Sequence, residues 1–323
     1  MNAPSPAAKA NASAKGKAKG KKKKSGAAAR PGRAAKPKRA EREDRHVLYE
    51  LAVQCVEAEI DFVDDTFRQL RNRKLATLRE DFAGTCNTSA EFVSRRATNF
   101  AVGVDLDRPT LDWGASRHIE GRLQPAERER LTQLCENVLE TDGRHALKDM
   151  GAPDADAGFD AVLAMNFSYF ILQQREQLRA YFKRVLSTLK PDGILFLDCY
   201  GGYESYSECE DERRIKPDKD AGVKPYNYIW DQHRYNPITG EMDCKIHFTF
   251  DDGSEMRDAF LYTWRMWTMP EIREILAEAG FRKSTVYWEG TDEDDPEQGN
   301  GEYAPTEEGD ADPAWVCYIV AEK

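Results

Sequence analysis

The sequence predicts an α/β fold with a mainly parallel sheet, and three observations lead to it. An apolar strand that begins at Leu75 is followed by a turn around Gly84 and then by a helix. A second apolar strand, residues 100–104, ends on Asp105, which follows Gly84 by 21 residues. Strand, helix and strand alternate again over residues 159–200. Rossmann-like sheets place a carboxylate for ribose hydroxyls about 20 residues after the glycine turn, so we expect a cofactor pocket here.

The glycine turn lacks the composition of a dinucleotide site. A G-x-G-x-x-G fingerprint needs further glycines around Gly84, but Phe82 and Cys86 flank it at that spacing. A pyrophosphate requires the close backbone approach that those glycines allow, whereas a ligand without phosphates does not. The turn therefore favours a cofactor other than a dinucleotide. The plain alternative is that Gly84 only turns the chain of an ordinary α/β domain.

The stretch Arg79-Glu-Asp-Phe-Ala-Gly-Thr85 resembles motif I of the class I S-adenosylmethionine-dependent methyltransferases, and it is similar to a bacterial subgroup of that family. On this pattern Glu80 takes the place of the motif acid and Gly84 that of the central glycine. The resemblance implies S-adenosyl-L-methionine as cofactor, with Gly84 and Thr85 in its site and Glu80 or Asp81 at its methionine part. It also implies a seven-stranded, mainly parallel sheet, and an antiparallel β insert after strand five is expected as a departure from the minimal fold.

The resemblance implies further contacts along the next two strands. Asp105 would hold the ribose hydroxyls, with Leu106 beside it, because a carboxylate can accept two hydrogen bonds from a vicinal diol. Capping the next helix is the alternative role for Asp105. A third strand is expected at residues 134–139, where Asn137 would receive the adenine amino group and Val138 would touch the ring. Asn137 could equally be an ordinary turn residue.

The fourth strand is expected to end at Asn166, at a position that lies beside the transferring methyl in many relatives. We therefore expect Asn166 to contact both cofactor and acceptor. Tyr169 could help to orient the acceptor, and Arg265 could bind a carboxylate on it. An amphipathic helix over residues 178–189 and a buried strand over residues 194–200 follow. No residue in the sequence is a compelling general base, so catalysis would rest on alignment and the exclusion of water.

Residues 201–267 are expected to form an antiparallel insert above the cofactor, as a substrate lid, a dimer surface or both. Alternating side chains and turn sequences predict strands at residues 226–235, 241–250 and 255–267. The alternation in the second strand places His247 on the solvent face, so we interpret it as a surface residue. Six aromatic residues could form an acceptor pocket or simply pack the insert: Tyr200, Tyr203, Tyr206, Tyr226, Tyr228 and Trp230.

The C-terminal part, residues 268–323, completes the core. Thr268 and Glu271 are spaced as a capping box at the start of a helix, and two strands are predicted after it, at residues 281–288 and 314–321. Between them, residues 289–313 contain eleven acidic residues and no basic one. This run indicates a solvated loop, although its negative potential could also draw in a cationic acceptor or the basic tail.

The net charge of −10 is unevenly distributed. Residues 1–40 hold ten lysines, three arginines and no acidic residue, so they carry +13 and the remainder carries −23. We expect residues 1–42 to be a disordered basic tail, because they cannot bury enough apolar surface to fold. The tail could contact RNA or another polyanion, or act only to solubilise the chain. The core would begin with residues 43–200, opening on helices that cover the cofactor.

Composition excludes several classes. No apolar run reaches 18 residues and no secretory pattern is present, so we expect a cytoplasmic protein without membrane contact. Seven cysteines without a C-x-x-C spacing and five scattered histidines argue against a disulfide framework and a zinc site, so we predict no metal.

We therefore expect an S-adenosylmethionine-dependent methyltransferase that acts on a small molecule and could form a homodimer. The alternatives are an RNA or protein methyltransferase guided by the basic tail, and a non-catalytic S-adenosylmethionine-binding protein.

Overall fold

The computed structural model describes residues 37–218, 221–292 and 299–323. The expected basic tail, residues 1–42, therefore lies almost entirely outside the described residues. At its described end a short 3-10 helix, η1 (Arg39–Glu41), packs on the β insert. The Arg39 guanidinium donates hydrogen bonds to the carbonyl oxygens of Pro225 at 2.8 Å and of Lys224 at 3.1 Å, which anchors the chain at this point.

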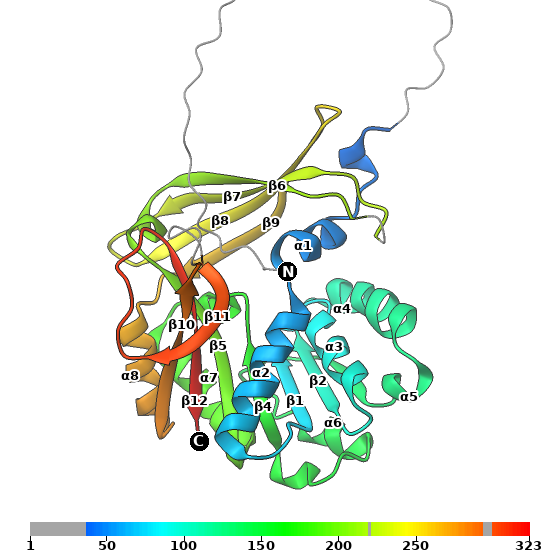
Figure 1. Cartoon of the computed structure of the whole chain (residues 1–323), viewed down its shortest axis with the longest axis vertical. Helices are drawn as coiled ribbons and strands as arrows, with labels where there is room; N and C mark the ends of the chain where they lie inside the picture. Colours follow the sequence, from blue (N-terminus) through cyan, green and yellow to red (C-terminus); the bar gives the residue numbers. More distant parts are fainter. Residues whose placement is uncertain (1–36, 219–220, 293–298) are drawn as a thin grey trace, which may run out of the picture.

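A twisted sheet of eight strands forms the centre of the protein (Figure 1). Its spatial order is β11 (Gly299–Thr306), β10 (Lys283–Thr291), β12 (Trp315–Glu322), β5 (Leu189–Gly201), β4 (Phe159–Ala164), β1 (Thr77–Asp81), β2 (Phe100–Asp105) and β3 (Leu131–Cys135). Strands β3, β2, β1, β4 and β5 are parallel, and β12 runs antiparallel between β5 and β10. The predicted mainly parallel α/β fold is confirmed.

The predicted strand count of seven is wrong, because the acidic run contains an eighth strand, β11. It pairs antiparallel with β10. The ring of Tyr303 in β11 lies 4.6 Å from that of Tyr318 and 6.0 Å from that of Phe62, between ring centroids. Packing of this one aromatic residue supplies apolar burial that the acidic composition does not suggest.

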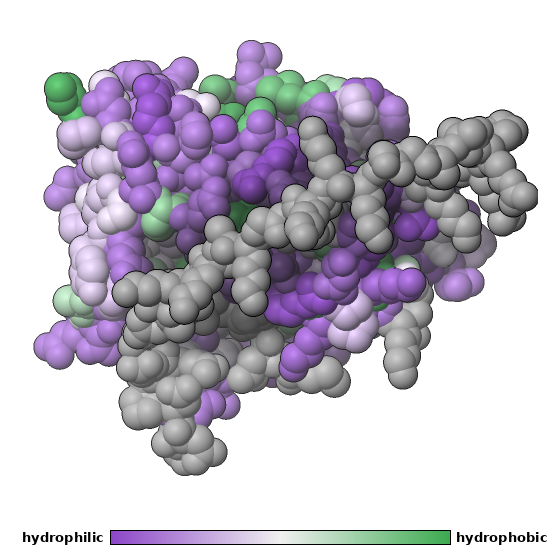
Figure 2. Space-filling model, turned by 90° about the horizontal axis from the view of Figure 1, so that it is seen from above, coloured by the Kyte–Doolittle hydropathy of each residue, from purple (hydrophilic) through white to green (hydrophobic). Residues whose placement is uncertain are grey.

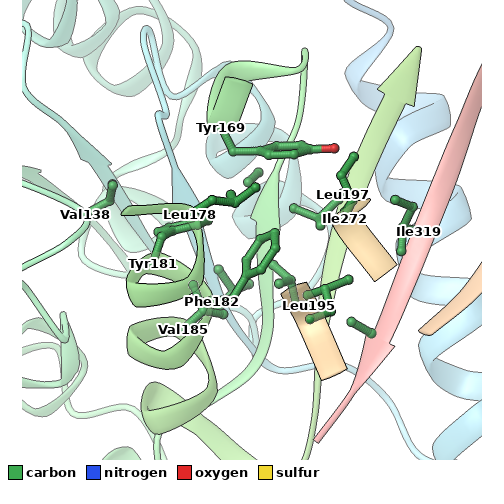
Figure 3. Packing of buried hydrophobic residues seen from close by; sticks show 14 of the residues in the cluster. Val138, Tyr169, Leu178, Tyr181, Phe182, Val185, Leu195, Leu197, Ile272 and Ile319 are labelled. Carbon is green, nitrogen blue, oxygen red and sulfur yellow. The ribbon is translucent and has the colours of Figure 1, made fainter. Parts of the chain in front are cut away.

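Helices cover both faces of the large sheet. On one face lie α2 (Val56–Arg71) and α3 (Asn87–Arg95), which bury an apolar stripe against alternate residues of β1, β4 and β5. On the other face lie α6 (Arg144–Asp149), α7 (Arg175–Thr188) and α8 (Met269–Ala279). Figure 3 shows α7 residues such as Tyr181 and Phe182 packed toward Leu195 and Leu197 of β5. The capping box predicted for α8 is present, between Thr268 and Glu271.

The remaining helices lie outside these two layers or at their edges. They are α1 (Arg45–Val53), α4 (Arg108–Gly114), the π-helical η2 (Ala115–Glu120), α5 (Pro125–Arg128) and the 3-10 helices η3 (Ala155–Ala157), η4 (Ser168–Ile171) and η5 (Tyr203–Tyr206).

The insert forms a second sheet above the first, with α1 between them (Figure 1). Its order is β6 (Cys209–Ile215), β7 (Tyr226–Tyr235), β8 (Glu241–Phe250) and β9 (Glu255–Arg265). The insert is antiparallel as predicted, but it has four strands where three were expected. Strand β6 is an edge strand whose charged sequence shows no apolar alternation, so only its pairing with β7 reveals it.

Two sequence-based placements are wrong. The third strand runs over Leu131–Cys135, earlier than the predicted residues 134–139. His247 is 3% exposed, not a surface residue. The register of β8 against β9 shifts between Ile246 and Phe248, which breaks the simple alternation. The backbone N–H of Asp258 donates to His247 Nδ1 at 2.8 Å and so covers the ring.

Seen from the side of the small sheet, the visible surface is mainly hydrophilic with scattered hydrophobic patches (Figure 2). Within the part of the chain that the structure describes, no helix is long and apolar enough to cross a bilayer.

Candidate active site

The turn between β1 and α3 has the backbone of a glycine-rich loop, although only Gly84 of its three alternate positions is a glycine. Phe82 has a φ of 56°, Gly84 of 50° and Cys86 of 57°, so all three alternate positions are left-handed. This conformation is ordinary for glycine but costs a non-glycine residue of order 1 kcal/mol or more. Two side chains are thus held where a glycine motif would place glycines.

Asp105 fixes this turn from the end of β2. One carboxylate oxygen, Oδ2, accepts the backbone N–H of Gly84 at 2.8 Å, and the other, Oδ1, accepts the N–H of Asp107 at 2.8 Å. Each oxygen keeps a free lone pair, so the carboxylate could still accept hydrogen bonds from a diol. Beside it, Leu106 is 67% exposed, which leaves an apolar surface next to the carboxylate.

The space at the turn fits a ligand. A methyl group built on Gly84 would meet only one atom within 4 Å, the Thr110 methyl carbon at 3.9 Å. A nucleoside with no phosphate could therefore lie against Gly84 while its hydroxyls reach Asp105. These residues would hold S-adenosylmethionine by its ribose.

The two acids of motif I point in opposite directions. Glu80 faces α3, where it accepts the Ser89 backbone N–H at 2.9 Å and the Ser89 hydroxyl at 2.5 Å, and burial raises the pKa of Glu80 to about 7. Asp81 lies on the other face in a fully buried ion pair with Arg79 at 2.6 Å and accepts the Tyr181 hydroxyl at 2.9 Å. Of the two predicted residues, only Glu80 lies on the α3 side of the strand.

Helices α1 and α2 cover the turn through three side-chain hydrogen bonds. The Thr85 hydroxyl donates to Glu50 at 2.7 Å, and the Thr88 hydroxyl donates to Glu59 at 3.3 Å. Asn87 donates to Gln54 at 3.1 Å. Thr85 is therefore hydrogen-bonded to α1, which lies over the turn. A ligand bound at the turn would lie beneath this helix.

The predicted adenine residues are occupied by structural contacts. Asn137 Oδ1 accepts the Leu139 backbone N–H at 3.0 Å, which makes a local turn. Val138 is 5% exposed and belongs to the core on the α7 side (Figure 3). Both residues lie in the loop after β3, which ends at Cys135.

The end of β4 forms a second strained turn. Asn166 has a φ of 57° and Phe167 of 56°, and their backbone N–H groups donate to the two oxygens of Asp198 at 2.7 and 2.9 Å. Two successive left-handed non-glycine residues need such an anchor, because each is costly alone. Asp198, in the buried strand β5, therefore shapes the loop that carries Asn166.

Asn166, Phe167 and Asp198 open onto a cavity of about 640 Å³. Its wall comes from α1 and α2, the ends of β4 and β5, the small sheet, and strands β10 to β12. Gly84, Asp105 and Asn137 are not part of this wall, so the cavity lies beside the motif I turn, on the β5 side of β4. The motif I turn and the adjoining chamber are therefore separate, and Asn166 lines the chamber.

The wall of the chamber is aromatic and acidic. Of its thirty described residues, eleven are aromatic and six carry carboxyl groups. Burial raises the pKa of Glu59 to about 7, and burial together with the charge of Glu59 raises that of Asp198 to about 7. No general base was predicted, but an acidic residue within the otherwise apolar sequence of residues 194–200 could have pointed to Asp198.

Two predicted acceptor residues lie away from the chamber. Tyr169 is fully buried in the core (Figure 3). Its hydroxyl donates to the Asp198 carbonyl oxygen at 2.9 Å. Arg265 donates to the Gln173 carbonyl oxygen and to Glu271, each at 3.2 Å, and stacks on Trp267 at 3.8 Å from the ring centroid. Neither residue is part of the described wall.

The six aromatic residues expected at an acceptor pocket divide evenly. Tyr200, Tyr228 and Trp230 line the chamber. Tyr226 is buried within the small sheet, whereas Tyr203 and Tyr206 are 64% and 40% exposed.

Glu210, Asp231 and His247 bring potential metal-binding atoms within 4.8 Å of one another. However, His247 Nδ1 accepts the Asp258 N–H at 2.8 Å, so the neutral ring carries its proton on Nε2, which faces Asp231 Oδ2 at 3.3 Å. His247 and Asp231 are therefore joined by a hydrogen bond, and the geometry favours a proton over a metal ion between His247 Nε2 and Asp231 Oδ2.

Comparison with known proteins identifies a consistent fold. No protein-family model matches the chain. A protein of Geobacillus sp. (strain WCH70) named as a putative methyltransferase is 25% identical over 138 residues, which are 42% of this chain. The match spans 54% of that protein, about half of its length.

Solved structures match more of the chain. An S-adenosylmethionine-bound amino pentose methyltransferase, CalS10, from Micromonospora echinaspora has a TM-score of 0.57 at 17% identity, over 86% of this chain and 95% of that one. An S-adenosylmethionine-dependent methyltransferase from Clostridium acetobutylicum also has a TM-score of 0.57, at 14% identity over 86% and 96%. The sugar N-methyltransferase KedS8 from Streptoalloteichus sp. has a TM-score of 0.55 at 15% identity, over 92% and 97%.

Proposed function

Because the chain has the fold of the class I S-adenosylmethionine-dependent methyltransferases, we propose that it is such an enzyme and methylates a small molecule. The observation that carries the proposal is the motif I turn. Its alternate left-handed residues keep the shape of the glycine motif, and Asp105 is bonded to Gly84 in front of open space. The strain held there is typical of a ligand site.

The residues around the turn have distinct roles in this proposal. Asp105 holds the ribose hydroxyls, Leu106 offers apolar surface to the adenine, and Glu80 keeps α3 in place through Ser89. S-adenosylmethionine supplies an activated methyl group, so the protein mainly aligns the acceptor and excludes water. In this proposal Asn166, which lines the chamber, contacts both the cofactor and the acceptor.

The chamber supports a small-molecule acceptor over RNA. Six carboxyl groups in its wall would repel a polyanion. A volume of about 640 Å³ lies in the range of small-ligand sites, which is about 300–1,000 Å³. The relatives that methylate sugars have the same fold, which fits an acceptor of this size.

Calorimetry of the full chain with S-adenosylmethionine, S-adenosylhomocysteine and NAD tests the proposal. We expect both sulfur nucleosides to bind and NAD not to bind. Asp105→Ala should weaken S-adenosylmethionine by about tenfold or more, which corresponds to about 1.4 kcal/mol. Asp112→Ala, on the exposed face of α4, is the matched control. Failure of S-adenosylmethionine to bind, or equal binding by Asp105→Ala, would contradict the proposal.

Binding without turnover would instead identify a non-catalytic S-adenosylmethionine-binding protein. Incubation with S-adenosylmethionine and fractionated metabolite pools, read by mass spectrometry for a gain of one methyl group, separates the two. Loss of that product in Asn166→Ala, with S-adenosylhomocysteine still bound, is the expected result for an enzyme.

A further inference from the structure

The charge of the chamber restricts what can enter it. Six acidic residues from four separate parts of the fold face it: Glu59, Asp61, Asp65, Asp198, Asp211 and Glu289. Arg213 is the one basic residue among the described residues of the wall. Such an excess of negative charge, which is complete above about pH 7 where Glu59 and Asp198 are also ionised, concentrates cationic ligands between low-dielectric walls.

The aromatic part of the wall suits the same kind of ligand. The rings of Tyr262 and Trp264 lie 4.8 Å apart, and that of Trp230 lies 5.8 Å from Trp264, so they form a continuous aromatic surface under the small sheet. On the opposite wall, Phe62 stacks on Tyr318 at 4.3 Å. Aromatic faces attract ammonium groups, and the interaction strengthens where water is excluded.

Asp198 lies in the chamber wall beside the loop that follows β4. It is 8% exposed, lines the chamber, and holds the loop of Asn166 and Phe167 through two backbone hydrogen bonds. A group bound to its carboxylate would therefore lie next to Asn166, the residue that the proposed function assigns to the methyl donor. Glu59 faces the same space from α2.

We propose that the acceptor is the amino group of a cationic small molecule and that Asp198 receives the proton from that group before methyl transfer. The inference rests on the proposed methyltransferase function and names its substrate class. Asp198 would then be a catalytic residue, and the aromatic wall would hold the rest of the cation.

The step balances without a further reactant. The ammonium group gives one proton to the Asp198 carboxylate and becomes a neutral amine with a free lone pair. That pair attacks the methyl carbon, so a C–N bond forms while the C–S bond breaks and its electron pair returns to sulfur. A neutral thioether leaves, and the product is the methylated ammonium ion.

The surroundings of Asp198 suit this role. Its burial and the nearby charge of Glu59 raise its pKa to about 7, which makes it a stronger base than an ordinary carboxylate. The other titratable groups that interact with it are uncharged near neutral pH: Tyr169, Tyr303, Cys317 and Tyr318. Activity should therefore rise with pH through about 7.

Three probes of one length test the charge requirement: hexane-1,6-diamine, hexane-1,6-diol and hexanedioate. Each is titrated into the full chain saturated with S-adenosylhomocysteine, and heat is measured at several pH values. We expect the diamine to bind about tenfold or more tighter than the diol, and hexanedioate not to bind. Asp198→Asn and Glu59→Gln should each weaken the diamine and leave the diol unchanged.

The outcomes separate the two proposals. If S-adenosylhomocysteine binds but the diamine does not, or binds no better than the diol, the amine proposal is overturned and the methyltransferase proposal stands. If Asp198→Asn binds the diamine with the affinity and pH profile of the wild type, Asp198 does not have the proposed role. If neither S-adenosylmethionine nor S-adenosylhomocysteine binds, the proposed function itself fails.

Discussion

Replacing Asp198 by asparagine should stabilise the folded protein above neutral pH. Asp198 is 8% exposed, and burial raises its pKa from 3.8 to about 7. A carboxyl group whose pKa is higher in the folded state stabilises that state only while protonated. Its contribution is complete below the unfolded pKa, near 3.8, and is lost as the pH rises through about 7.

The size of the effect follows from the shift. The pKa difference is about 3 units, and one unit corresponds to about 1.4 kcal/mol, so ionisation costs the wild type about 4 kcal/mol of folding free energy. Asparagine stays neutral, but its amide nitrogen cannot accept one of the two backbone N–H groups, of Asn166 and Phe167, that the carboxyl oxygens of Asp198 accept. The stability of Asp198→Asn relative to wild type should therefore be lower by about 1–3 kcal/mol at about pH 4, because one hydrogen bond is lost, and should rise by about 4 kcal/mol between about pH 4 and pH 8.

Urea unfolding of wild type and Asp198→Asn, followed by tryptophan fluorescence at several pH values, measures this difference. Asp112→Asn on exposed α4 corrects for the loss of one negative charge. A stability difference between Asp198→Asn and wild type that stays constant from acidic to alkaline pH would refute the reasoning, because it would mean that Asp198 ionises equally easily in both states.

Further substitutions probe other parts of the chain. Arg79→Met should cost about 3–5 kcal/mol in urea unfolding, because it leaves Asp81 charged and buried, and adding Asp81→Asn should recover part of that loss. Thr268→Ala should cost about 1 kcal/mol by removing the α8 cap, as measured by thermal unfolding. Deleting residues 1–36 should abolish salt-sensitive binding to single-stranded RNA in fluorescence titrations; an unchanged salt slope would discard the RNA hypothesis.

Local sequence rules predict the regular elements well where side-chain patterns are strong. Strands β7 and β8 occupy the predicted residues 226–235 and 241–250, because both alternate and both end in recognisable turns. Strand β6 was not predicted, because an edge strand can carry charged residues on both faces. Strand β11 was not predicted, because a single packed residue, Tyr303, anchors it to the sheet.

The site is predictable in outline only. Gly84 and Asp105 are local to their strand ends, and the structure brings them together as the spacing suggests. Sequence order cannot tell which distant elements a side chain will face once the chain has folded. For this reason Tyr169 was expected at the acceptor but is buried, whereas Asp198 and Glu59, from β5 and α2, form the acidic part of the chamber.

The side chains that replace glycines in the motif I turn have a consequence for ligand affinity. The Phe82 ring lies 5.6 Å from that of Tyr181, and Cys86 fills the space that Gly103 leaves open. A turn fixed in this way has fewer alternative conformations than one made of glycines. A ligand then meets a preorganised surface and loses less free energy to ordering the loop. We therefore expect Cys86→Gly to bind S-adenosylhomocysteine with a more unfavourable entropy change than the wild type.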